Sequence, residues 1–136
     1  MSILIITGHG EYAKGMKSSL DLILGPKESI YAIDFVDSVD NLIDSYLKII
    51  ESNEGNILFA CDLLGGTPFK EAAKLSASNK NIRVVTGANI GGLLDTSFKL
   101  ETFQLDDLVE NLITKSKENI VEFKQVEKKN VSSDGI

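Results

Sequence analysis

The stretch that decides the fold runs from Asn56 to Pro68 and reads NILFACDLLGGTP. Residues 56–61 form an apolar run of strand length, and the glycine-rich segment that follows ends in Thr67 and Pro68. Threonine is a favoured N-cap residue and proline is favoured at the first helical position, so we expect Thr67 to cap a helix over 68–78. The stretch therefore predicts a strand, a polar loop and a helix in direct succession.

The same alternation recurs along the rest of the chain. Apolar runs rich in β-branched residues predict four strands, over Ile3–Thr7, Ile30–Phe35, Asn56–Cys61 and Ile82–Thr86. Apolar residues at helical spacing predict helices between the strands and over most of the C-terminal part, where they fall on Leu105, Leu108, Val109, Leu112 and Ile113. Continuous apolar strands separated by helices are typical of a parallel sheet covered on both faces. We therefore expect an open, doubly wound α/β fold with four parallel strands.

Composition limits the class of protein and the kinds of site. At 136 residues, 43% apolar and 25% charged, the chain predicts one globular domain, which we place at residues 1–125. Residues 126–136 are polar and aperiodic, so we expect a flexible tail. The net charge of −6 argues against nucleic acid as a partner. The start lacks the features of a secretory signal and no apolar run is long enough for a membrane span, so a cytoplasmic protein is expected.

The counts of cysteine and histidine narrow the possible chemistry. One cysteine, Cys61, excludes an internal disulfide and a cysteine-based zinc site. His9 is the only histidine, so a metal centre would have to consist mostly of carboxylates. We therefore expect no metal centre.

Three of the predicted strands end in glycine-rich polar loops, at residues 8–10, 62–68 and 87–92, and Asp34 and Asp37 stand near the end of the remaining strand. Sites in open parallel sheets lie at these carboxyl ends, where the strand order reverses. Gly65, Gly66 and Thr67 precede the predicted helix, and backbone N–H groups there would bind phosphate or another anion. The spacing fits neither a Walker P-loop nor a dinucleotide-binding motif, and a plain capped turn stays open as an alternative.

His9 and Asp62 would lie side by side if the first and third strands are neighbours. A carboxylate that accepts from Nδ1–H leaves Nε2 unprotonated and nucleophilic, and it stabilises the ring when the ring becomes cationic. With the anion-binding helix start beside it, this pair predicts a histidine phosphoryl carrier. His9 would be the nucleophile through Nε2, Asp62 the orienting carboxylate, and Gly65, Gly66 and Thr67 the elements that bind the phosphoryl group.

Other functions fit the same residues less well. Cys61 directly precedes Asp62, and strand alternation turns it to the opposite face as a buried, inert thiol, which disfavours a Cys-His hydrolase. A response-regulator receiver needs a cluster of acids after the first strand, where this chain has Gly8-His9-Gly10. A regulatory binding module with the same fold and anion pocket, but without phosphoryl transfer, stays open.

Four short motifs carry a family resemblance in the same order along residues 1–125: ITGHG-x-x-A-x-G from Ile6, Ile33-Asp34-Phe35, DLLGGTPF from Asp62, and TGANIGGLL from Thr86. The chain resembles the mannose-type enzyme IIA domains of the bacterial phosphoenolpyruvate-dependent sugar phosphotransferase system (PTS). This resemblance implies that His9 accepts a phosphoryl group from the phosphocarrier protein HPr and passes it to a IIB component, which serves the membrane IIC and IID components. No IIB domain follows in this sequence, so we expect IIB to be a separate chain. Because HPr brings an already activated phosphoryl group, we expect no metal and no organic cofactor. It also implies that Asp62 hydrogen-bonds the active histidine, that an antiparallel edge strand joins the sheet, and that the protein is a homodimer.

Two positions depart from the pattern of that family. Gly8 stands where a serine or threonine is common, which removes one hydroxyl that could face the phosphate. The fourth-strand loop continues from Asn89-Ile90 into Gly91-Gly92 instead of a proline-methionine pair, which predicts a less rigid loop. Neither departure touches His9, Asp62 or the glycines before the predicted helix.

Overall fold

The computed structural model describes residues 1–125, which form one sheet and five helices. The strands are β1 (Ser2–His9), β2 (Ile30–Phe35), β3 (Asn56–Cys61) and β4 (Ile82–Thr86). The helices are α1 (Tyr12–Leu24), α2 (Val39–Glu51), α3 (Thr67–Ala77), α4 (Ile90–Ser97) and α5 (Leu105–Glu118). All strand pairings in the sheet are parallel, in the order β2-β1-β3-β4.

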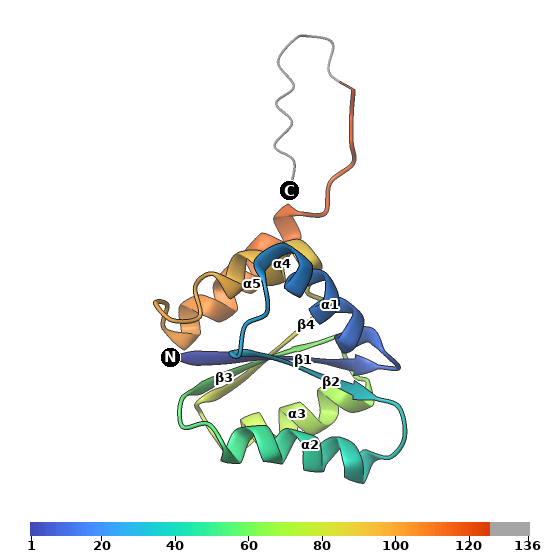
Figure 1. The fold of residues 1–136 in the computed structure, drawn as a ribbon, viewed down its shortest axis with the longest axis vertical. Coiled ribbons are helices and arrows are strands. Elements are labelled where there is room, and N and C mark those ends of the chain that lie inside the picture. Colours follow the sequence, from blue (N-terminus) through green and yellow to red (C-terminus); the bar gives the residue numbers. More distant parts are fainter. Residues whose placement is uncertain (126–136) are drawn as a thin grey trace.

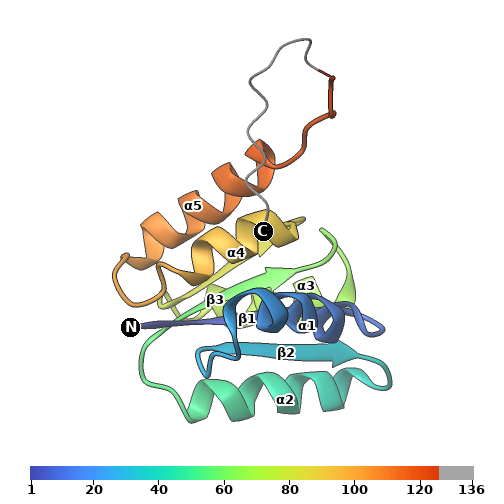
Figure 2. The same ribbon diagram turned by 45° about the horizontal axis from the view of Figure 1, so that its top comes forward.

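Helices cover both faces of the sheet, as the sequence predicts. Helices α2 and α3 lie on one face, and α1, α4 and α5 lie on the other (Figures 1 and 2). Two separate apolar clusters fill the space between the sheet and these two layers. The central strands β1 and β3 are buried on both faces, which explains why they read as continuous apolar runs. The predicted open, doubly wound α/β fold is confirmed.

The strand order reverses between β1 and β3. From β1 the chain moves outward to β2 on one side, then returns to add β3 and β4 on the other side. The carboxyl ends of β1 and β3 are therefore adjacent, and the N–H of Asp62 donates to the carbonyl of Thr7 at 3.1 Å just beyond the last paired residues. A crevice at such a reversal is the usual ligand site of an open parallel sheet.

The first strand is longer than predicted. The sequence places Gly8 and His9 in a loop, whereas β1 runs through His9 because Gly8 and His9 pair with Asp34 and Phe35 of β2. The strand ends before Gly10, whose φ is +58°. His9 is thus the last residue of a central strand, and its backbone is held by pairing with Phe35 of β2 on one side and by the Asp62 side chain on the other.

The start of α3 is also different from the prediction. Gly66 is the N-cap, with extended backbone angles, and its carbonyl accepts the N–H of Lys70 at 2.9 Å. Thr67 is the first helical residue, so the prediction that Thr67 caps a helix beginning at Pro68 is wrong by one position. Glycine is an acceptable N-cap, and proline suits the first turn because no N–H is needed there.

The predicted loop after β4 is partly helical. Asn89 caps α4 by accepting the N–H of Gly92 at 3.0 Å, so Gly91 and Gly92 belong to the first turn of the helix. A Cβ atom on either glycine would overlap Asn119 or Ser116, which places α5 directly against this turn. The assignment of Gly91 and Gly92 to a loop is therefore wrong, and their lack of side chains allows two helices to pack closely.

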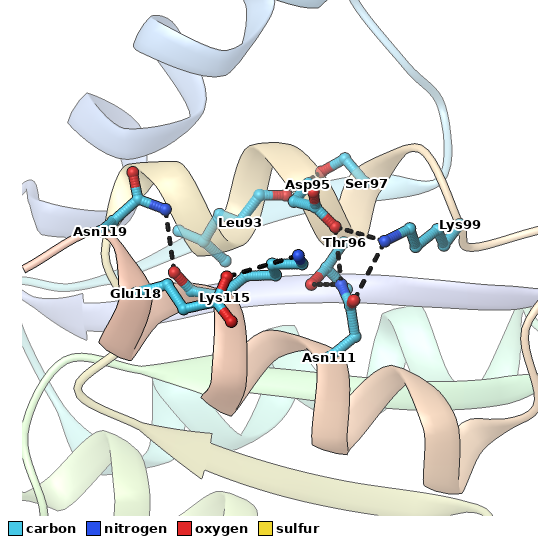
Figure 3. Close-up of polar contacts among 9 residues, drawn as sticks. All are labelled: Leu93, Asp95, Thr96, Ser97, Lys99, Asn111, Lys115, Glu118 and Asn119. Carbon is cyan, nitrogen blue, oxygen red and sulfur yellow. Dashed lines mark hydrogen bonds and ion pairs between the residues drawn. The ribbon is translucent and has the colours of Figure 1, made fainter.

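Side-chain hydrogen bonds join the C-terminal end of α4 to the middle of α5 (Figure 3). The Asn111 amide of α5 donates to Asp95 and to Thr96 of α4, at 3.0 Å each. Lys99 bridges the two helices by donating to Asp95 at 2.6 Å and to Asn111 at 3.0 Å. This network fixes the layer that covers the β3 and β4 side of the sheet.

Two expectations concern the edges of the fold. Within residues 1–125 no antiparallel edge strand joins the sheet, because the residues that follow α5 in this range make no strand pairing. The predicted flexible tail at 126–136 lies outside the described residues.

In the part of the chain that the structure describes, none of the helices combines the length and apolar character needed to cross a lipid bilayer.

Candidate phosphoryl-transfer site

His9 and Asp62 meet at the point where the strand order reverses. The Nδ1 atom of His9 lies 2.8 Å from Oδ2 of Asp62, and the backbone N–H of His9 donates to the same oxygen at 2.9 Å. The histidine side chain is 45% exposed and the aspartate 14%, so the carboxylate supports the ring from inside the protein. A carboxylate can only accept, so Nδ1 carries the proton and Nε2 is left with a free lone pair.

The Nε2 edge of the ring faces the start of α3. A Cβ atom built on Gly66 would lie 2.7 Å from Cε1 and 3.4 Å from Nε2 of His9, so the ring rests against the N-cap of the helix. The first-turn N–H groups of an α-helix have no acceptor within the helix, and the helix dipole is positive at this end. The nucleophilic nitrogen is therefore next to an anion-binding helix terminus.

The individual residues of the glycine-rich loop have different places in this arrangement. Gly65 has a φ of +86°, which a side chain would disfavour. The Gly66 N–H donates to the Leu63 carbonyl at 3.2 Å and so closes the turn before α3. Pro68 has no N–H, so the remaining N–H donors in the first turn of α3 are those of Thr67 and Phe69.

The charge on Asp62 is set by two opposing effects. Partial burial alone would raise the pKa of Asp62, but the two hydrogen bonds from His9 and the charge of the His9 ring lower that pKa overall. Asp62 therefore stays ionised at neutral pH. Its Oδ1 atom is buried and has no hydrogen-bond partner among the described residues, so its polar contacts are concentrated on Oδ2.

Gly8 is confined by its neighbours. A Cβ atom here would lie 2.5 Å from Cδ1 of Tyr12 and 2.8 Å from Cγ of Asp62. The departure noted in the sequence is thus explained by packing, because Tyr12 and Asp62 fill the space that a serine or threonine side chain would need. The Tyr12 hydroxyl reaches across to the carbonyl of Ala88 at 3.4 Å and connects α1 to the loop after β4.

The two aspartates at the end of β2 serve the local structure. Asp34 accepts the N–H of Lys14 at 3.0 Å and so caps the first turn of α1 from a neighbouring strand. Asp37 accepts from the backbone of Ser38 and from the Asn41 amide at the start of α2. Both acids hold the helices that flank the site.

Some residues of the site could not be identified from the sequence. The ring of Phe35 packs edge-on against His9, with 5.8 Å between the ring centroids. Tyr46 of α2 lies behind the site, where its hydroxyl contacts Thr7 and Pro68. Each of these residues reads as part of an ordinary apolar pattern, so only the tertiary structure shows its relation to His9.

Cys61 is fully buried in the apolar cluster on the α2 and α3 face. Burial and the nearby Asp62 charge raise the pKa of the Cys61 thiol to about 12. We expect iodoacetamide at mildly alkaline pH to leave the folded protein unmodified and to label it fully in urea, as measured by intact mass. Rapid labelling of the folded protein would contradict the placement of this thiol and would reopen the Cys-His hydrolase.

Within residues 1–125, no group of three histidine, cysteine, aspartate or glutamate side chains is arranged to hold a metal ion. The chemistry available at the site is thus that of one imidazole, one carboxylate and the start of a helix. An imidazole nitrogen that is aimed at an anion-binding terminus, with its other nitrogen fixed by a carboxylate, is suited to attack phosphorus.

Comparison with known proteins identifies the family. A family model described as EIIA-man, the PTS system fructose IIA component, matches residues 3–113. The chain belongs to the EIIA-man family. The resemblance inferred from the sequence motifs is therefore confirmed, and the site described above lies within the matched residues.

Individual members of the EIIA-man family are similar over most of this chain. The PTS system fructose-specific EIIA component of Bacillus subtilis (strain 168) is 29% identical over 123 residues, which are 88% of this chain and 84% of that protein. The mannose-specific EIIAB component of Escherichia coli (strain K12) is 32% identical over 102 residues, 71% of this chain but only 31% of that longer protein. The crystal structure of phosphotransferase system component EIIA from Streptococcus agalactiae has a TM-score of 0.81 at 35% identity and covers 90% of this chain and 97% of that one.

Proposed function

We propose that this protein is a phosphocarrier that accepts a phosphoryl group from phospho-HPr on His9 and passes it to a IIB component. One observation carries the proposal: His9 Nδ1 is held by Asp62 at 2.8 Å while Nε2 faces the N-cap of α3. The phosphocarrier domain would comprise residues 1–125. The IIB component would in turn serve the membrane IIC and IID components.

The transfer step follows from the geometry of the pair. The lone pair of His9 Nε2 attacks phosphorus as the bond between phosphorus and the imidazole nitrogen of the donor histidine breaks, and the departing nitrogen keeps that electron pair. The His9 ring then carries the phosphoryl group on Nε2 and the proton on Nδ1, and Asp62 stabilises the resulting positive charge. The first-turn N–H groups of α3, with the Thr67 hydroxyl, would hold the phosphoryl oxygens. The reverse sequence delivers the group to IIB.

The surface beside the site supports a protein as donor and acceptor. Leu63 and Leu64 directly follow Asp62, and they are 56% and 72% exposed. Val36 follows Phe35, the residue that packs on the His9 ring, and is 66% exposed. Exposed apolar side chains close to a reactive group are typical of a protein–protein contact.

Intact-mass analysis tests the proposal. After incubation with phosphoenolpyruvate, enzyme I and HPr, the wild-type protein should gain one acid-labile phosphoryl group, and subsequent addition of the cognate IIB should remove it. The His9→Ala variant should gain none, whereas Cys61→Ala should be labelled like the wild type. No labelling of the folded wild-type protein would contradict the phosphocarrier and favour the regulatory binding module.

We also propose that the protein is cytoplasmic and forms a homodimer. The outer edge of β4 is unpaired among residues 1–125, and Ile113, Ile120, Val121 and Phe123 on or after α5 are at least 38% exposed. An open strand edge beside exposed apolar residues favours association. Light scattering after size-exclusion chromatography should give twice the mass of one chain, and a monomer at micromolar concentration would contradict the dimer.

A further inference from the structure

A buried chain of hydrogen bonds links β1 to the start of α3 behind the site. The Thr7 and Tyr46 hydroxyl oxygens lie 2.9 Å apart, and the Tyr46 hydroxyl donates to the Pro68 carbonyl at 3.0 Å. A phenol has a single proton and a carbonyl can only accept, so Thr7 must be the donor to Tyr46. Thr7 and Tyr46 are both fully buried. The direction of each hydrogen bond is therefore determined.

The two ends of this chain belong to the two halves of the site. Thr7 lies two residues before His9 in β1, and its carbonyl accepts the N–H of Asp62 at 3.1 Å. Pro68 lies in the first turn of α3, two residues after the N-cap Gly66. The histidine and its carboxylate are thus fixed at one end, and the anion-binding terminus at the other.

The hydroxyl of Tyr46 is not needed to fill the core. The ring packs edge-on against Phe59 of β3, with 4.9 Å between centroids, in a cluster of apolar side chains that would accept phenylalanine. A buried hydroxyl is costly unless its hydrogen bonds are satisfied, and satisfied buried networks make a structure rigid. The Tyr46 hydroxyl satisfies this condition through contacts to two elements other than its own helix.

We propose that Tyr46 and Thr7 are positioning residues that set the distance between His9 and the N-terminus of α3 during phosphoryl transfer. This inference rests on the proposed phosphocarrier function. Neither residue touches the reacting atoms, and both act through the backbone that carries them. The His9 ring and the backbone of Gly66 lie close together: a Cβ atom built on Gly66 would be only 2.7 Å from the ring.

Rapid-quench measurement of transfer from phospho-HPr tests this inference. We expect Tyr46→Phe and Thr7→Val each to lower the maximal transfer rate by about tenfold, since a misplacement of about 1 Å can cost about 100-fold. The concentration of phospho-HPr that gives half the maximal rate should stay within about twofold, because the docking surface is unchanged. Thr7→Ser keeps the hydroxyl and should transfer nearly as fast as the wild type.

A double variant and a matched control sharpen the result. Tyr46→Phe with Thr7→Val should be no slower than either single variant, because both remove the same connection. Tyr31→Phe deletes a hydroxyl from a tyrosine that packs on the same apolar cluster, and it should leave the rate unchanged. All rates are compared at a temperature where circular dichroism shows each variant folded. If Tyr46→Phe does not fold, the comparison of Thr7→Val with Thr7→Ser still tests the inference.

Two results would overturn the inference while leaving the phosphocarrier itself intact. One is a maximal rate within about twofold of wild type for folded Tyr46→Phe or Thr7→Val. The other is an equal loss of rate in Thr7→Ser and Thr7→Val, which would assign the effect to the packing of Thr7. Failure of the wild-type protein to accept a phosphoryl group would instead contradict the proposed function.

Discussion

Asp62→Asn should slow phosphoryl transfer to His9 by about 100-fold to 10,000-fold, by analogy with loss of the aspartate in a catalytic triad. The side chain keeps its shape, but the amide can donate to Nδ1 and so favour the tautomer in which Nε2 carries the proton. It also removes the negative charge that stabilises the cationic ring. Rapid-quench kinetics with phospho-HPr as donor measure the effect.

Asp37→Asn is the matched control for this substitution. Asp37 is an exposed aspartate near the same edge of the sheet, and its contacts are with Ser38 and Asn41 at the start of α2. Its variant should transfer at the wild-type rate. If Asp62→Asn stayed within about twofold of wild type, Asp62 would not be the residue that orients His9.

Gly66→Ala should lower the transfer rate by about 100-fold, since small misplacements of a reacting group have effects of this size. The backbone of Gly66 has a φ of −77° and a ψ of 168°, which alanine adopts without strain. Its Cβ would nevertheless lie 2.7 Å from Cε1 of His9 and would push the ring away from the helix start. Gly66→Ala is therefore expected to move the His9 ring without straining the backbone of the fold.

Gly65→Ala provides the opposite case. A φ of +86° is unfavourable for alanine, but a Cβ here would meet no atom within 4 Å. We expect this variant to lose about 1–3 kcal/mol of stability and to retain more transfer activity than Gly66→Ala. Urea unfolding and rapid-quench rates on both variants check the contrast. Equal rates for Gly66→Ala and wild type would show that His9 does not need its place against α3.

The fold was predictable because its signals are local. Strands buried on both faces appear as continuous apolar runs, and the glycine-rich breaks after them mark the carboxyl end of the sheet. The ends of the elements were less predictable, because pairing with β2 extends β1 through His9 and because either Gly66 or Thr67 can cap a helix. The first turn of α4 was assigned to a loop because it contains Gly91 and Gly92, which the close packing on α5 requires.

The central pair of the site was predictable for a different reason. His9 and Asp62 stand at the carboxyl ends of adjacent parallel strands, so their meeting depends only on the order of the strands. The roles of Tyr46 and Gly8 depend on contacts across three elements, which no residue spacing records. The sequence likewise assigned Asp34 and Asp37 only to the edge that holds the site. The structure shows that Asp34 caps α1 and that Asp37 hydrogen-bonds Ser38 and Asn41 at the start of α2.

Phosphorus and nitrogen NMR of the phosphorylated protein test the central claim most directly. Because His9 is the only histidine, one phosphohistidine signal reports on the site without any need for assignment by mutation. Asp62 holds Nδ1 and the other ring edge faces α3, so we predict the Nε2 phosphoryl isomer. Detection of the Nδ1 isomer would contradict this account of how Asp62 and the start of α3 act on His9.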